Sequence, residues 1–326
     1  MAEVVERVEC QDGEELLAAI SLRGKYFRGR RRESRSGMER WIFRGQAQEW
    51  PLLPSALRAG EHGPLMFHSR EGWARVAPTN TVEQHNAELF TIQKFFWEAD
   101  SQGLSLPNDS QLLRRQLAQF DMIVDDHFEE RADGLPMALW PPEVLLSTFA
   151  LAQHHGIPTR LLDWTRKPFV AAYFAARDAA RERFKNDAIE PTRLVIYAFK
   201  ASVLELDYAE RRERFTSIVA APRYGNPNLH AQAGVFTVER LRRLSIGDPV
   251  DRRPFDEQLV AAARNYPDGE WPLLRVFTLP NRFSTELLWL LYLEGLTASA
   301  VFPGFNGVAE TLKDEELFQG LGLPER

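Results

Sequence analysis

The sequence predicts an α+β fold in which a helix-rich first half packs on a small mixed or antiparallel sheet. Apolar residues recur at helical spacing through residues 81–131. Short apolar runs that are typical of buried strands come mostly late, at 192–199, 235–238 and 273–279. Few segments alternate between strand and helix, which favours α+β over a doubly wound parallel sheet.

Composition and charge limit the classes of protein that the chain can represent. The 326 residues are 44% hydrophobic and 26% charged, with a net charge of −6, so an overall electrostatic attraction to nucleic acid is not expected. The single cysteine, Cys10, excludes a disulfide within the chain and any multi-cysteine metal site. We therefore expect a cytoplasmic protein. No apolar run is long enough to cross a bilayer, and the acidic start is not a signal peptide.

Residues 1–22 are predicted to form an N-terminal extension, and residues 23–326 the main domain with a helical insertion at about 81–131. The extension combines a short strand (4–8) with a helix for which Asp12 is a suitable N-cap. An arginine-rich loop follows at 25–35. This loop is either a solvated segment or a local contact for anions and nucleic acid.

The run Trp41-Ile42-Phe43 is predicted to be a short buried strand. We expect Arg44 and Gly45 to end it, which would present a guanidinium at a sheet edge with room for a ligand to approach. Arginine suits bidentate binding of phosphate, although Arg44 could instead pair with a buried carboxylate. The proline-punctuated loop at 50–58 is either a rigid wall of the site or part of the core.

Helices are predicted at 81–102 and 112–128, separated by a break at 103–109, and a third helix begins after Pro141-Pro142. That third helix leads into the most polar stretch of the sequence, residues 150–165. The stretch combines His154-His155-Gly156 with two arginines around an aspartate and a tryptophan, and an alanine-rich helix then runs to about residue 183. We interpret it as the wall of a site.

The later part of the chain contains a second polar stretch at 221–234. Residues 202–220 are predicted to be mixed helix and loop. Helices are expected at 255–263 and at 286–294, the second with Ser284 as N-cap and Gly295 at its end. Residues 301–308 lead into a closing helix.

The motifs exclude several kinds of chemistry. The adjacent His154 and His155 cannot easily bind one ion, and the sequence has no zinc motif, Walker sequence, dinucleotide fingerprint or serine elbow. No metal is expected. The remaining polar residues, Arg44, Arg160, Arg223, His230 and Gln232, would suit a phosphorylated aromatic ligand. His155 and Asp163 would form either an acid–base pair or a structural hydrogen bond.

At Phe43-Arg44-Gly45 the sequence resembles the FRG domain, which is named for this tripeptide. Residues 153–165 are similar to the family's central motif, and residues 171–175 to its following helix. Residues 223–236 and 293–307 are similar to its two later motifs, with Gly304 and Asn306 in place of the usual acids. The resemblance covers roughly residues 20–315.

The layout is also similar to that of ADP-ribosyltransferases, which implies a cleft that binds NAD. The resemblance implies that Arg44 binds an NAD phosphate and that Tyr173 or Trp164 stacks on nicotinamide. A carboxylate would then steady the ribosyl cation. Gln232 stands where a glutamate is expected, so either Asp163, Glu239 or Glu286 would serve, or the site would not be catalytic in this way.

The predicted site is summarised by role. The expected catalytic residues are Arg44, His155 and Asp163. The expected cofactor-binding residues are Arg44, Gly45, His154, Gly156, Thr159, Arg160, Trp164, Tyr173, Arg223 and Gln232.

Three functions follow from this reading. The first is an NAD-dependent ADP-ribosyltransferase-like enzyme that modifies a nucleic acid or a protein, as in a toxin or a phage-defence effector. The second is a non-catalytic module that senses a nucleotide or nucleic acid. The third is a nuclease or hydrolase that uses a His/Asp acid–base pair.

Overall fold

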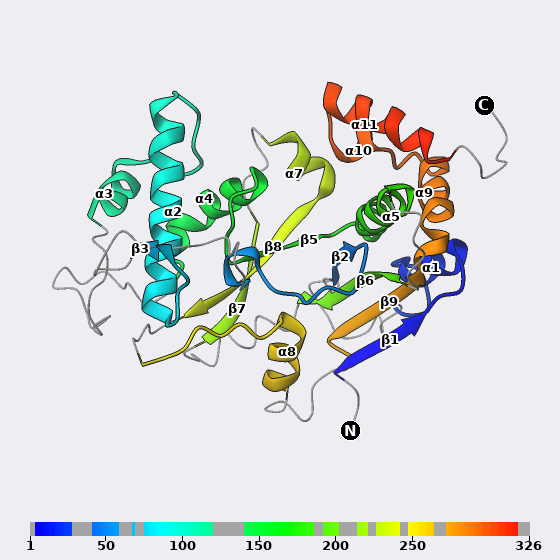
Figure 1. Ribbon diagram of the computed structural model, residues 1–326, viewed down its shortest axis with the longest axis horizontal. Helices are drawn as coiled ribbons and strands as arrows, with labels where there is room; N and C mark the ends of the chain where they lie inside the picture. Colours follow the sequence, from blue (N-terminus) through cyan, green and yellow to red (C-terminus); the bar gives the residue numbers. More distant parts are fainter. Residues whose placement is uncertain are drawn as a thin grey trace, which may run out of the picture.

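The computed structural model describes residues 4–27, 41–58, 67–68, 75–119, 140–185, 192–201, 214–220, 226–241, 247–263 and 272–318. Its centre is a seven-stranded mixed sheet with the order β1-β9-β6-β2-β5-β8-β7 (Figure 1). The strands are β1 (Val5–Glu9), β2 (Trp41–Gln46), β5 (Leu161–Thr165), β6 (Arg193–Lys200), β7 (Arg214–Val219), β8 (Gly234–Leu241) and β9 (Leu274–Pro280). β1 is parallel to β9, and the other neighbouring pairs are antiparallel. The α+β class is confirmed.

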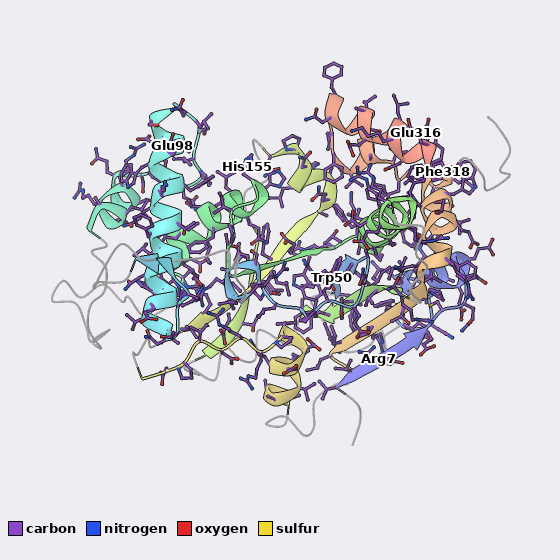
Figure 2. The ribbon with its side chains drawn as sticks, in the orientation of Figure 1. Arg7, Trp50, Glu98, His155, Glu316 and Phe318 are labelled. Carbon is purple, nitrogen blue, oxygen red and sulfur yellow. The ribbon has the colours of Figure 1, made fainter. Side chains whose placement is uncertain are left out.

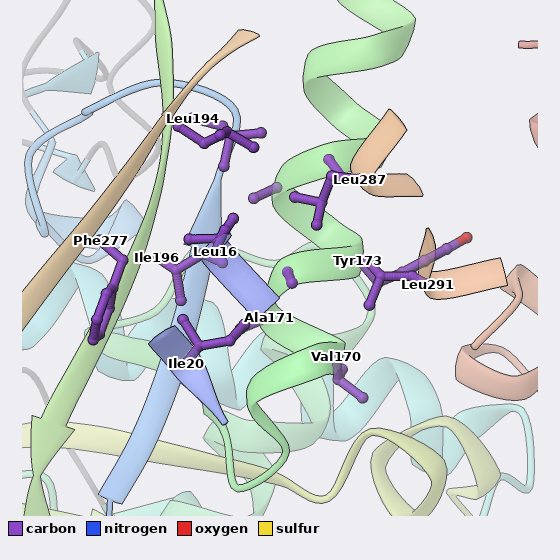
Figure 3. Packing of buried hydrophobic residues seen from close by; sticks show 14 of the residues in the cluster. Leu16, Ile20, Val170, Ala171, Tyr173, Leu194, Ile196, Phe277, Leu287 and Leu291 are labelled. Atoms are coloured by element: carbon purple, nitrogen blue, oxygen red, sulfur yellow. The ribbon is translucent and has the colours of Figure 1, made fainter. Parts of the chain in front are cut away.

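Helices cover one face of the sheet with an apolar layer. This layer consists of α1 (Gly13–Ile20), α5 (Pro168–Lys185) and α9 (Ser284–Leu293). Leu16 and Leu287 meet Ile196 and Phe277 of the sheet in one buried cluster (Figure 3). Burial of this much aliphatic and aromatic surface is the main stabilising term for the right-hand half of the molecule in Figure 1.

The opposite face of the sheet carries α8 (Phe255–Ala263). Alternation along β6 separates the two layers, because Ile196 belongs to the α5 side while Val195 and Tyr197 belong to the α8 side. A third cluster joins the end of the sheet to α2 (Thr81–Ser101), α3 (Gln111–Gln119) and α4 (Glu143–His154). These three helices form the left-hand side of Figure 1.

The smaller elements complete the chain. They are the hairpin β3 (Phe67–His68) and β4 (Arg75–Val76), the helices α7 (Pro227–Gln232), α10 (Ala298–Val301) and α11 (Phe305–Glu316), and the 3-10 turns Ser55–Leu57 and Asn281–Phe283. No helix in the described ranges is both long and apolar enough to span a membrane. The N-terminal segment belongs to the central sheet, because β1 pairs with β9 over five residues.

Several sequence-based predictions differ from the structure. Arg44 and Gly45 do not end their strand at a sheet edge: β2 continues to Gln46 and is the fourth of seven strands, bonded to β6 and β5. Residues 214–219, predicted to be helix and loop, form the edge strand β7. Ser284 is the first residue of α9 rather than its N-cap, because the 3-10 turn precedes it directly. Most of the arginine-rich loop at 25–35 lies outside the described residues.

Candidate functional site at the seam between β2 and β5

The central polar motif forms a tight turn between α4 and β5. His154 is the last residue of α4, His155 is its C-cap, and Gly156 has a φ of +80°. This left-handed conformation reverses the chain and favours glycine. The Thr159 hydroxyl bonds to the Gln153 side chain and accepts from the Leu161 amide.

The loop of residues 50–58 is hydrogen-bonded to this turn. Ser55 Oγ accepts from the amide of Thr159 at 3.2 Å, and the amide of Ala56 donates to the carbonyl of Thr159 at 3.0 Å. These bonds tie residues 50–58, the loop predicted to be a wall or part of the core, to the start of β5. The turn and the loop therefore form one hydrogen-bonded unit.

Arg160 lies in the interior, where it pairs with Glu88 of α2. Its Nε and Nη2 donate to the two carboxylate oxygens at 2.6 and 2.9 Å, and the two side chains are 3% and 0% exposed. Trp140 and Gln84 also donate to the Glu88 carboxylate, at 3.0 and 2.7 Å. The pair thus fixes the start of β5 against α2.

Arg44 bridges the seam between β2 and β5. These strands share a single residue pair in register, Phe43 with Thr165. Arg44 Nη1 donates to the main-chain oxygen of Asp163 at 2.9 Å and lies 3.6 Å from its Oδ2. With the Gln46 amide turned so that both bonds form, its oxygen accepts from Arg44 Nε at 3.2 Å and its nitrogen donates to the carbonyl of Trp50 at 3.0 Å. The guanidinium is therefore held in one orientation by neighbours on both strands.

Exposure and charge differ between the two partners at this seam. The side chain of Arg44 is 17% exposed, whereas that of Asp163 is 57% exposed. Burial lowers the pKa of Arg44, and the negative charge of Asp163 opposes this shift. The result is a partly buried cation beside a carboxylate that is open to solvent.

Gly45 sets the distance between β2 and α5. A Cβ atom at this position would lie 1.8 Å from the carbonyl oxygen of Ala171 and 3.1 Å from the Cβ of Ala175. No other residue fits without moving backbone. The glycine therefore allows α5 to lie directly on β2, and alternation along the strand directs Arg44 to the other face.

His154 and His155 stand at the C-terminal end of α4, and the charge of Asp163 acts on His154. Their rings are 5.3 Å apart and nearly perpendicular, and His155 is exposed (Figure 2). Burial lowers the pKa of His154, the neighbouring His155 lowers it further, and Asp163 acts in the opposite direction. Burial and the neighbouring His155 thus favour the neutral form of the His154 imidazole.

The two aromatic side chains predicted to stack on a ligand are in the core. Trp164 is 3% exposed and belongs to the α8 side of the sheet, where its Nε1 donates to Thr237 at 2.9 Å. Tyr173 is 1% exposed and belongs to the α5 side, where its hydroxyl donates to Asp314 at 2.7 Å. The sheet separates the two rings, so they cannot line one cavity together.

The later polar stretch meets the junction between β5 and α5. The hydroxyl of Thr165 donates to the carbonyl of Gln232 at 2.5 Å, and Lys167 Nζ donates to the carbonyl of Ala231 at 2.8 Å. The Gln232 amide donates to the carbonyl of Val301 at 3.3 Å. Gln232 therefore joins α7 to α10, while Arg223 lies outside the described residues.

The structure brings together only part of the predicted set. Arg44, Gly45 and Asp163 lie at the seam, and the charge of Asp163 acts on His154. The sequence did not single out Glu88 or Gln46, and Trp50 had only its place in the predicted wall. Trp50 is 45% exposed (Figure 2), and its carbonyl is linked to Arg44 through Gln46. Among the described residues, no group of three or more His, Cys, Asp or Glu side chains is arranged to hold a metal ion.

Comparison with known families identifies the class of domain. Residues 39–184 match the family model of the FRG domain, a segment that contains β2, the helical part, the central turn, β5 and α5. This part of the chain is an FRG domain, and its tripeptide is Phe43-Arg44-Gly45. The comparison with curated proteins finds no match, and neither does the comparison with solved structures.

Proposed function

We propose that this FRG protein binds NAD at the seam between β2 and β5 and transfers ADP-ribose to a nucleic acid or protein acceptor. One observation carries the proposal: the FRG tripeptide on β2 and Asp163 on β5 lie on neighbouring strands, and Arg44 donates to the main-chain oxygen of Asp163. They are far apart in the sequence, and the sheet makes them adjacent. The arginine and the central aspartate thus meet at one seam.

Arg44 would bind a phosphate of NAD. Its guanidinium is held by Asp163 and Gln46 before any ligand arrives, so little side-chain entropy is lost on binding. Its low exposure of 17% strengthens attraction to an anion relative to a fully solvated arginine. Arginine also offers the planar donor arrangement that phosphate oxygens accept.

Asp163 is the carboxylate best suited to steady positive charge on the ribose. It lies 3.6 Å from Arg44 and is open to solvent. Glu286 is at the start of α9, where its pKa is raised by burial and by the acidic residues Asp12 and Glu14 of the α1 region. Glu239 lies on β8, which pairs with β5 and β7 and not with β2. We therefore propose that Asp163 serves in place of the glutamate expected at Gln232.

The neutral imidazole of His154 would accept the proton of the attacking group. In the proposed reaction the bond between the ribose and nicotinamide breaks, nicotinamide leaves, and the acceptor forms the new bond to the ribose. Asp163 acts by its charge, and His154 as general base. The exposed indole of Trp50 is the aromatic surface for a ring of the ligand, in place of the buried Trp164 and Tyr173.

The test incubates the purified protein with NAD labelled on its adenylate part, together with total RNA, DNA and protein of a cell extract. The variants are Arg44→Ala and Asp163→Asn, and Glu286→Gln is the matched control because it also converts a carboxylate to an amide away from the seam. We expect label transfer by the wild type and by the control. Loss in both seam variants supports the proposal.

Transfer that survives Asp163→Asn would contradict the role of this carboxylate. Binding of NAD without label transfer or nicotinamide release would favour a sensing module instead. The observation that the charge of Asp163 acts on His154 supports a second candidate, an acid–base hydrolase. That candidate predicts cleavage of a phosphodiester or ester in the same extract without any need for NAD.

A further inference from the structure

The outer surface of α11 carries an exposed apolar stripe. Phe305 is 95% exposed, Val308 is 51% exposed and Leu312 is 60% exposed, and Ala309 between them is also exposed. Among the described residues, Phe305 has the highest exposure of the large apolar side chains. Contiguous apolar surface of this kind marks an interaction site more often than scattered single residues do.

Helical geometry places this stripe on one line. With about 100° of rotation per residue, positions 305, 309, 312 and 316 lie within a narrow sector of the helix. Their spacing of four, three and four residues is that of the contact positions in paired helices. The opposite side of α11 is the anchored side, where Asp314 accepts from Tyr173 and Arg177 at 2.7 and 3.1 Å.

We propose that α11 binds α11 of a second copy of this chain in an antiparallel arrangement. In this register the small Ala309 faces the large Leu312 of the partner, and the same contact occurs twice about the two-fold axis. Phe305 then lies beside Glu316 of the partner. Such alternation of small and large side chains lets the helices interdigitate, and a two-fold interface uses the same patch on both chains.

Charge complementarity supports the antiparallel direction. Gly304 precedes α11 and supplies no side-chain hydrogen bond to its first turn, so the positive end of the helix is uncapped. Glu316, exposed at the other end of α11 (Figure 2), would be brought to the first turn of the partner helix. A parallel arrangement would separate these groups and align the two helix dipoles unfavourably.

The size of the patch limits the strength of the association. One helix of twelve residues spans about 18 Å, which is small compared with the interfaces of permanent dimers. The structure therefore assigns a weak, concentration-dependent dimer. This inference does not depend on NAD binding.

The test is sedimentation velocity of the full chain from low to high micromolar concentration. Leu312→Glu should weaken dimerisation at least tenfold. Phe184→Glu is the matched control, because Phe184 is an apolar residue of α5 that is 73% exposed away from the stripe, and it should associate like the wild type. Glu316→Lys reports on the direction of pairing and should also weaken the dimer, while circular dichroism verifies that each variant is folded.

Each outcome decides a part of the proposal. A wild type that stays monomeric over the whole range would overturn it, as would a dimer that tolerates Leu312→Glu. Equal weakening by Phe184→Glu would show that association uses another surface. A dimer that is lost in Leu312→Glu but unchanged in Glu316→Lys would overturn the antiparallel register.

Discussion

Arg44 donates a hydrogen bond of 2.9 Å to the main-chain oxygen of Asp163, while the carboxylate of Asp163 remains 57% exposed. The arginine of the FRG tripeptide is therefore linked to the aspartate of the central motif, 119 positions later in the chain. This contact is possible because β2 and β5 pair at a single position and leave room for the guanidinium beside it. It defines the place where we expect a ligand.

Gly45→Ala should strongly destabilise the protein. The new Cβ would lie 1.8 Å from the carbonyl oxygen of Ala171, so β2 and α5 must separate, at a cost of about 3 kcal/mol or more. Gly234→Ala is the comparison, because the close contact of its Cβ, at 2.5 Å, would be with the movable methyl group of Leu229 and not with backbone. Urea unfolding measures both variants, and equal losses would contradict the close packing of β2 on α5.

Glu88→Gln should lower the free energy of unfolding by about 3–5 kcal/mol, because it leaves the charge of Arg160 buried without its counter-charge. Adding Arg160→Met to this variant should restore part of the loss, since the unpaired charge is then removed. Thermal or urea unfolding of the two single variants and the double variant gives the coupling energy. Strictly additive losses would show that the two side chains do not interact.

His85 should make the protein less stable in mild acid. Burial and the nearby Arg160 lower its pKa to about 3, while an unfolded histidine titrates near ~6.5. Between these values the unfolded state binds the extra proton, so stability falls as the pH falls from about 6.5 towards 3, by up to ~1.4 kcal/mol per pH unit. Urea unfolding at several pH values should show a shallower dependence for His85→Gln, and an unchanged dependence would contradict a neutral buried His85.

His154 should titrate below the usual histidine range, and its pKa should respond to its neighbours with opposite signs. Asp163→Asn removes a charge that raises this pKa, so the variant should titrate at still lower pH. His155→Gln removes a charge that lowers it, so that variant should titrate higher. NMR titration of the imidazole, assigned with His154→Gln, measures both shifts. An unchanged pKa of His154 in Asp163→Asn would show that the charge of Asp163 does not act on this histidine.

Local signals in the sequence predicted much of the fold. Asp12 caps α1 as expected, accepting from the amide of Glu15 at 2.8 Å, and the helix at 255–263 matches the structure. These features depend on neighbouring residues alone. The strand β7 escaped prediction because Thr216 and Ser217 interrupt its apolar pattern, and its pairing with β8 supplies the missing stabilisation.

The site was harder to predict because its contacts join distant segments. Arg44 looked like a residue at a strand end, since nothing in the sequence shows that β2 lies between β6 and β5. Arg160 looked like a ligand-binding residue, since its partner Glu88 is 72 positions away on a helix where a glutamate usually faces solvent. The burial of Trp164 and Tyr173 was not predicted either, because the residues that cover their rings come from other strands and helices.

Calorimetric titration of NAD into the wild type and Arg44→Lys tests the account most directly. Lysine keeps the charge but loses the planar donors that contact Asp163, so we expect the wild type to bind and Arg44→Lys to bind at least about tenfold more weakly, which is ~1.4 kcal/mol. Arg115→Lys, a change of an exposed arginine on α3 that bonds to Gln111, should bind like the wild type. A wild type that does not bind NAD, or an Arg44→Lys variant that binds it equally well, would contradict the assignment of the seam as the NAD site.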